Sequence, residues 1–273
     1  MPLDAFALAL AAAVVHALWN LLTARADDSQ AAAGVALATG TLAFAPVAAL
    51  TWDVRAGVAP FVVASSALEV AYLALLATAY QRAPLTVVYP IARGAAPVIV
   101  LVVGVVALGA SLPAGAALGV LAVGGGVVLV RGDASGRGGT LLGLAVAACI
   151  AGYTLVDHAG LDHAAPIPYL ELVMIPTSIA YLAGAAALWG PRALVAELRP
   201  ATVVAGLGMF GAYALALAAL ARAAAAPVAA VRESSVVIAT ALAAAVLHER
   251  VDRRRWTGAV LVVAGVAAIA LAG

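Results

Sequence analysis

The sequence predicts an all-α integral membrane protein, with ten transmembrane helices in two inverted five-helix repeats. Of its 273 residues, 66% are hydrophobic and 10% are charged, against about 47% and about 25% in soluble globular domains. Apolar runs near the length of about 20 residues needed to cross a bilayer follow one another along the whole chain. The two halves of the chain also share residues at one constant spacing.

Charge and cysteine content exclude several classes of protein. The net charge of +1 argues against a binder of nucleic acid or of strongly charged surfaces. All 14 basic residues are arginine, which we attribute to codon bias. The single cysteine, Cys149, excludes an intramolecular disulfide and a paired-cysteine metal or redox site. We therefore expect no metal and no cofactor.

Ten apolar runs are separated by polar or Gly/Pro-rich breaks. They cover residues 3–24, 30–52, 60–82, 85–109, 112–130, 139–158, 168–189, 201–222, 225–248 and 256–272. The first run differs from a cleaved signal, because its N-terminus carries Asp4 and no arginine, and His16 and Asn20 interrupt it. Nearly the whole chain is therefore expected to lie in the membrane.

The longest polar stretch, residues 131–139, divides the chain into halves of five runs each, residues 1–135 and 136–273. A constant shift of 139 positions places Arg93 on Arg232. The same shift places Gly119 on Gly258 and Gly126 on Gly265. A repeat with an odd number of helices inserts its second copy upside down, which is a plan that many secondary transporters share.

The arginine distribution predicts the orientation. Ten arginines fall in the odd-numbered connections, and only Arg55 and Arg222 fall in the even-numbered ones. The positive-inside rule then makes the odd connections cytoplasmic and places both termini on the opposite side.

Glu69 is the first candidate for a functional residue, because ionisable groups within a span are costly. At helical spacing it shares a face with Ser65, Tyr72 and Tyr80. This polar stripe indicates a cavity wall whose carboxylate binds a cationic group or a proton. The alternative is a structural hydrogen bond between helices.

Two arginines form the second set of candidates. Arg93 shares a face with Tyr89, and Arg232 precedes Glu233 and Ser235 in the second half. The repeat places the two arginines at mirrored depths, which suits two gates that bind a carboxylate or phosphate. The alternatives are an ion pair of Arg93 with Glu69 or Glu233, and pairing of Arg232 and Glu233 with other helices.

The first run contributes His16 and Asn20, stacked one turn apart, with Trp19 beside them. Tyr153 and Asp157 occupy the matching places of the sixth run. A proton relay and an ordinary interhelical hydrogen bond are both open for His16. Further acidic and histidine residues, expected to line a solvated vestibule near one membrane face, are Asp157, His158, Asp162, His163 and Glu171.

Several segments resemble the EamA family of the drug/metabolite transporter superfamily. They are His16-Ala-Leu-Trp-Asn20, Ala79-Tyr-Gln-Arg-Ala-Pro84, Val88-Tyr-Pro-Ile-Ala-Arg-Gly94, Val231-Arg-Glu-Ser-Ser-Val236 and His248-Glu-Arg-Val251. The resemblance implies a multi-pass carrier of the bacterial inner membrane that exports amino acids or related small metabolites by alternating access. The acidic turn of the family is degraded to Gly109-Ala-Ser111 in the first half, so a role for that turn is in doubt here.

Two other functions remain as alternatives. A multidrug cation/proton antiporter would use a membrane carboxylate, but the first run has none beyond Asp4. An intramembrane enzyme would need a nucleophile with a base, or a metal set, and no such motif occurs. We therefore expect no catalytic residues; the partners are a small-molecule substrate and the lipid bilayer, with proton coupling and a monomer or homodimer left open.

Overall fold

The structure is a computed structural model that describes the chain except residues 24–25, 83–84, 132–136, 248–252 and 273. The described residues form helices and no strand of a sheet. The helices are α1 (Leu3–Thr23), α2 (Ser29–Leu50), α3 (Ala59–Arg82), α4 (Leu85–Val106), α5 (Ala114–Arg131), α6 (Arg137–Gly160), α7 (Pro166–Trp189), α8 (Pro191–Ala196), α9 (Pro200–Leu220), α10 (Ala225–Arg232), α11 (Ser234–Leu247) and α12 (Arg253–Leu271).

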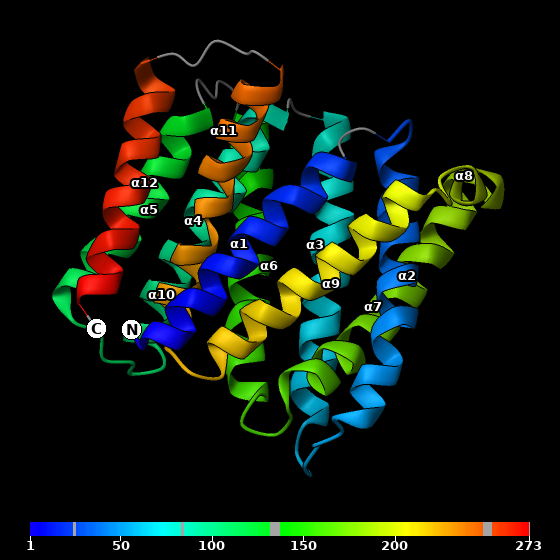
Figure 1. Cartoon of the computed structure of the whole chain (residues 1–273), viewed down its shortest axis with the longest axis horizontal. Coiled ribbons are helices and arrows are strands. Elements are labelled where there is room, and N and C mark those ends of the chain that lie inside the picture. The colour runs from blue at the N-terminus through cyan, green and yellow to red at the C-terminus, as the bar shows by residue number, and fades with distance from the viewer. Residues whose placement is uncertain (24–25, 83–84, 132–136, 248–252, 273) are drawn as a thin grey trace.

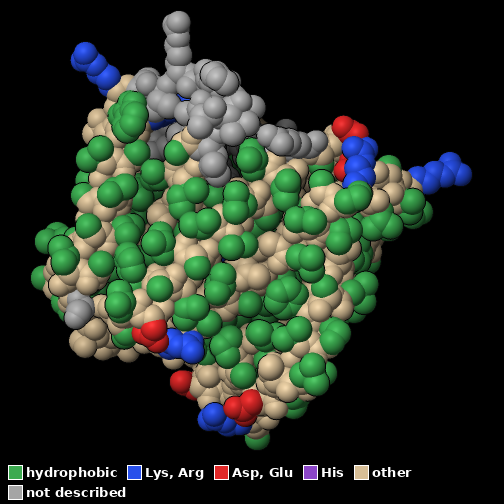
Figure 2. Space-filling model, in the orientation of Figure 1, with side chains coloured by type: hydrophobic (Ala, Val, Ile, Leu, Met, Phe, Trp, Pro, Cys, Tyr) green, Lys and Arg blue, Asp and Glu red, His purple; other side chains and the backbone are tan. Residues whose placement is uncertain are grey.

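Seven of these helices are long and apolar enough to cross a membrane: α1, α2, α3, α6, α7, α9 and α12. Shorter apolar stretches lie in α4, at Ile91–Val106, and in α5, at Ala114–Leu129. The visible face of the bundle is largely hydrophobic between two charged ends (Figure 2). Large apolar side chains of the bundle are exposed, such as Ile179 at 64% exposure, because lipid rather than water surrounds spanning helices.

The run expected at 225–248 is not one continuous helix. It divides into α10 and α11, with Glu233 between them. The Glu233 amide donates to Ala230 O at 3.0 Å, and the Val236 amide donates to Glu233 O at 3.0 Å, so the chain tightens to i→i+3 bonding here. Ser234 and Ser235 follow the break.

The helices α5 and α12 pack through glycines. A β-carbon at Gly119 would lie 2.7 Å from Gly265 O, and one at Gly126 would lie 2.7 Å from Gly258 O. The two backbones therefore touch with no side chain between them, as small residues permit in membranes. Contact positions rise along α5 while they fall along α12, so the two helices are antiparallel. These four glycines therefore form the packing face between α5 and α12.

Both termini lie at one end of the bundle (Figure 1). At that end the α2–α3 and α6–α7 connections pair through their backbones, with an isolated β-bridge between Val54 and Ala164. The Arg55 amide donates to His163 O at 2.7 Å beside this bridge.

At the opposite end, side chains join the α1–α2 connection to the segment between α7 and α9. Arg199 Nη2 lies 2.6 Å from Asp27 Oδ2. The Asp28 amide donates to Glu197 Oε1 at 3.0 Å. The Asp28 carboxylate in turn caps α2 by accepting from the amides of Gln30 and Ala31.

Candidate functional site

Polar and aromatic side chains from several helices meet inside the apolar bundle. They form two neighbouring groups, one around Arg93 and one around Asp157. Both centres are buried, with Arg93 at 9% and Asp157 at 0% exposure. Buried charges at membrane depth persist where they are paired or hydrogen-bonded, and both are.

The first group joins three helices. Arg93 of α4 lies with its Nε atom 3.2 Å from Glu233 Oε2, at the break between α10 and α11. Its Nη2 atom lies 2.9 Å from His16 Nε2 on α1. Of the ion pairs open at Arg93, the one with Glu233 forms. His16 is an interhelical hydrogen-bond partner, and its ring meets Trp19 edge to face at 5.1 Å.

The second group surrounds the Asp157 carboxylate of α6. It accepts hydrogen bonds from the hydroxyls of Ser65 on α3, Tyr169 on α7 at 3.1 Å and Tyr213 on α9 at 2.6 Å. The buried Glu69 side chain of α3 lies beside the same Tyr213 hydroxyl. Three helices are therefore hydrogen-bonded to the buried carboxylate of a fourth, and Tyr213 lies next to both Asp157 and Glu69.

Aromatic rings lie between the two groups. Tyr153 packs against Tyr72 at 6.2 Å and against Tyr213 at 6.3 Å between ring centroids. The Arg232 guanidinium lies 5.9 Å from the centre of the Tyr213 ring, within cation–π range. These ring contacts thus bring Tyr72, Tyr153 and Arg232 together with Tyr213.

Three polar atoms near the Arg93 group have no hydrogen-bond partner among the described residues: Trp19 Nε1, Ser234 Oγ and Ser235 Oγ. Ser235 is 2% exposed. An unsatisfied buried polar group costs free energy, which a bound polar molecule recovers. These atoms offer one donor and two hydroxyls beside the ion pair.

Three predicted site residues remain: Asn20, Tyr80 and Tyr89. Asn20 Nδ2 donates to His16 O at 2.8 Å, one turn back along its own helix. The side chains of Tyr80 and Tyr89 lie outside the described part of the structure.

The prediction of a solvated vestibule is wrong for two of its five residues. Asp157 is buried in the network above, and Glu171 is 4% exposed. The reason is that both face neighbouring helices rather than the membrane surface. His163 is at the surface end, where its ring stacks on Phe61 at 5.2 Å. Within the described ranges, no group of three or more His, Cys, Asp or Glu side chains is placed to hold a metal ion.

Sequence reasoning missed Tyr169 and Tyr213, and it placed Asp157 outside the candidate pathway. A signal existed for Asp157, because the shift that matches His16 to Tyr153 also matches Asn20 to Asp157. Tyr169 and Tyr213 are lone tyrosines on apolar helices, and nothing in the sequence distinguishes them from ordinary core residues.

The fold and the buried polar centre define a polytopic helical membrane protein. The model of the EamA-like transporter family matches residues 137–271. The chain therefore belongs to this family of the drug/metabolite transporter superfamily, as the sequence motifs indicated, and it is a multi-pass transporter of that type.

Among the solved structures that are similar to the chain is a crystal structure with a TM-score of 0.80 at 15% sequence identity, over 98% of this chain and 99% of that chain. At this identity the similarity concerns the fold alone. No curated protein sequence matches the chain.

Proposed function

We propose that the protein is a secondary transporter of the bacterial inner membrane that exports amino acids or related small metabolites by alternating access. In this proposal ten membrane-crossing segments form two inverted repeats, residues 1–135 and 136–273, and α10 with α11 makes one crossing. The substrate binds at the Arg93 group, next to the aromatic rings that separate this group from the Asp157 group.

The buried Arg93–Glu233 pair carries this proposal. A charge pair within spanning helices costs desolvation energy that its mutual attraction recovers only in part. Such a pair suits a zwitterion, whose carboxylate can bind Arg93 and whose ammonium can bind Glu233. The unpartnered Trp19, Ser234 and Ser235 atoms supply further hydrogen bonds to the same molecule.

Helix packing supports the inverted repeat. If Gly119 corresponds to Gly258 and Gly126 to Gly265, exchanging the halves converts the Gly119–Gly265 contact into the Gly126–Gly258 contact. Both contacts exist, with the helices antiparallel. The packing of α1 on α9 is likewise exchanged with the packing of α3 on α6, and both pairs pack.

The break at Glu233 supports alternating access. A helix interrupted next to an ion pair can change its local bonding without unfolding the two halves on either side. In the repeat, Arg93 and Arg232 lie at mirrored depths, so each is assigned to one of two gates.

An untargeted comparison of metabolites released by cells with and without the gene tests the proposal. We expect one or a few amino-acid-like compounds to fall in the medium when the gene is absent. Purified protein in proteoliposomes should then transport the same compound. The Arg55→Gln variant is the control and should transport the compound as the unchanged protein does, because Arg55 is a 69% exposed arginine at the end of the bundle. Unchanged release, together with no transport in proteoliposomes, contradicts the proposal.

Cysteine protection tests the two gates. With Cys149 replaced, Arg93→Cys and Arg232→Cys each provide the only thiol of the chain. Substrate should protect both from a small thiol reagent, and the two should be reached from opposite membrane sides. If both stay unreactive from both sides and Arg→Met at each lowers only the folded yield, the arginines are structural.

A second candidate is a cation/proton antiporter. The Glu69 and Asp157 carboxylates, with Tyr72, Tyr153 and Tyr213 around them, favour it because tyrosine rings and carboxylates both attract organic cations. Efflux of a cationic dye that requires Glu69, with no effect on released amino acids, would select this function over the first.

A further inference from the structure

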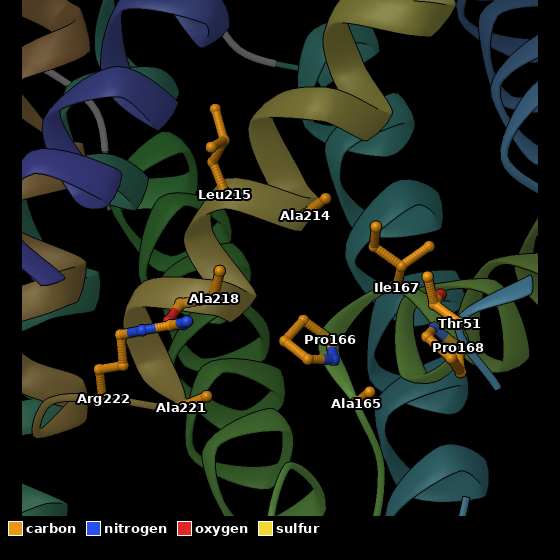
Figure 3. Close-up of a pocket in the computed structure, with 10 residues that line it drawn as sticks. All are labelled: Thr51, Ala165, Pro166, Ile167, Pro168, Ala214, Leu215, Ala218, Ala221 and Arg222. Atoms are coloured by element: carbon orange, nitrogen blue, oxygen red, sulfur yellow. The ribbon is translucent and has the colours of Figure 1, made fainter. Parts of the chain in front are cut away.

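A crevice of about 620 Å³ lies away from the buried charge network. It is formed by the first turn of α7 and the last two turns of α9, at the end of the bundle that carries both termini (Figure 3). Its volume is in the range of about 300–1,000 Å³ that small-molecule sites occupy. No residue of the Arg93 or Asp157 group lines it.

The lining of the crevice suits hydrocarbon. Ala214 and Ala218 on α9 and Ala221, directly after its end, follow one another along one side, and their short side chains leave the space open. On α7, Pro166 and Pro168 form the opposing wall. Proline has no amide hydrogen, so this helix start offers few donors to a polar ligand.

The crevice continues the lipid-facing surface of α9. Val204 and Leu207, nearer the start of the helix, are 55% and 43% exposed. A β-carbon at Gly211 would meet no atom within 4 Å, so the same side stays open further along. Ala214 and Ala218 follow at helical spacing. An acyl chain of the surrounding bilayer therefore reaches the crevice without crossing water.

An ion pair of two opposite charges lies at the opening of the crevice. Arg222 Nε lies 3.4 Å from Asp4 Oδ2, and the two side chains are 46% and 63% exposed. Arg222 Nη1 donates to Ala218 O at 2.6 Å, which holds the guanidinium over the crevice. The pair has no net charge, so it fits a headgroup that itself carries one negative and one positive charge. A guanidinium binds phosphate oxygens well, and a carboxylate binds an ammonium group.

We propose that this crevice binds a zwitterionic phospholipid with an ethanolamine headgroup. One acyl chain fills the space between α7 and α9, the phosphodiester binds Arg222, and the ammonium group binds Asp4. Because α9 also carries Tyr213, the lipid rests on the helix that connects Asp157 to Glu69. This site is separate from the proposed substrate pathway.

Native mass spectrometry of the whole protein, released from vesicles of phosphatidylethanolamine mixed with phosphatidylglycerol, tests the proposal. We expect one phosphatidylethanolamine to remain bound. Ala218→Phe, which fills the crevice, and Arg222→Gln should each lower its retention by about tenfold. Val204→Phe, on the lipid-facing side of the same helix, and Arg55→Gln, at the same end, should retain it as the unchanged protein does.

The headgroup is tested by Asp4→Asn, which should equalise retention of the two lipids, and by free phosphoethanolamine, which should not displace the bound lipid. A diazirine on the acyl chain should label residues 166–168 and 214–222 in the unchanged protein, which needs no variant to fold. Equal retention in Ala218→Phe and the unchanged protein, equal loss in Val204→Phe, or labelling spread evenly along α7 and α9 would each overturn the proposal and leave a non-specific lipid layer.

Discussion

The Tyr213 hydroxyl donates to Asp157 Oδ2 on α6 at 2.6 Å, and it lies beside Glu69 on α3. The same tyrosine ring lies under Arg232. A substitution at Tyr213 therefore changes the surroundings of three ionisable groups, Asp157, Glu69 and Arg232.

Tyr213→Phe should lower transport at least several-fold with little loss of protein in the membrane. The change removes one hydrogen bond, of about 1 kcal/mol, from a carboxylate that keeps Ser65 and Tyr169 as donors. Uptake into proteoliposomes measures the effect. Tyr181→Phe is the control, because that hydroxyl bonds Gln30 on α2, away from the network. Equal losses in both variants would contradict a special role for Tyr213.

Glu69→Gln keeps the shape and hydrogen-bonding capacity of the side chain but removes its charge. If the carboxylate binds a substrate cation or a proton, transport or its dependence on pH should collapse. Membrane expression should stay unchanged. Initial transport rates across a pH series provide the measurement. Normal rates at every pH would make Glu69 a structural hydrogen-bond partner.

Arg93→Met and Glu233→Met should each destabilise the protein by ~3–5 kcal/mol, because each leaves one buried charge without its partner. The double variant should recover much of this loss, since it leaves neither charge. Thermal unfolding in detergent measures stability, and transport is measured in parallel. Recovered stability without recovered transport would assign the pair to function. Additive losses would show that the 3.2 Å contact contributes little.

Gly119→Val should destabilise the bundle by ~1–3 kcal/mol, because its side chain would overlap the backbone of α12. Gly184→Val is the matched control, since a β-carbon there meets no atom within 4 Å. Both are valines placed in apolar helices, so helix propensity affects them equally. Melting temperatures that fall by the same amount would show that propensity, and not the α5–α12 contact, causes the loss.

The arginine distribution predicts membrane orientation. A reporter fused after Gly273 should behave as non-cytoplasmic, and a tag in the turn at Arg253 should be cytoplasmic. Paired reporters that are active only on opposite sides of the membrane make this measurement. The reverse pattern would show that the arginine count misleads here, without affecting the arrangement of helices.

The helix positions could be predicted from sequence because length and hydrophobicity alone decide which segments enter a bilayer. The expected run 3–24 is α1 at Leu3–Thr23, and the expected run 60–82 is α3 at Ala59–Arg82. The break at Glu233 could not be predicted, because Val231-Arg-Glu-Ser-Ser235 contains no proline or glycine and the pairing of Glu233 with Arg93 of α4 is a tertiary contact. The short helix α8 was also unexpected.

The candidate site was predicted in part. Glu69, Arg93 and Glu233 stood out because charge at membrane depth is rare, and the structure joins them into networks. Tyr213 carries no charge, and its role depends on which helix lies opposite it. Partner choice in a helical bundle is set by tertiary packing, which a single sequence does not reveal.

The connections at the two ends of the bundle are joined by different kinds of bonds, so they should respond differently to ionic strength. The Val54–Ala164 bridge and its neighbouring amides involve backbone groups that dissolved ions barely screen. At the other end, the Arg199–Asp27 pair is 48% and 76% exposed, and dissolved ions weaken such a pair. Raising the salt concentration should therefore loosen the contact between the α1–α2 connection and the start of α9, together with the exposed Arg222–Asp4 pair, and leave the backbone link between the α2–α3 and α6–α7 connections in place.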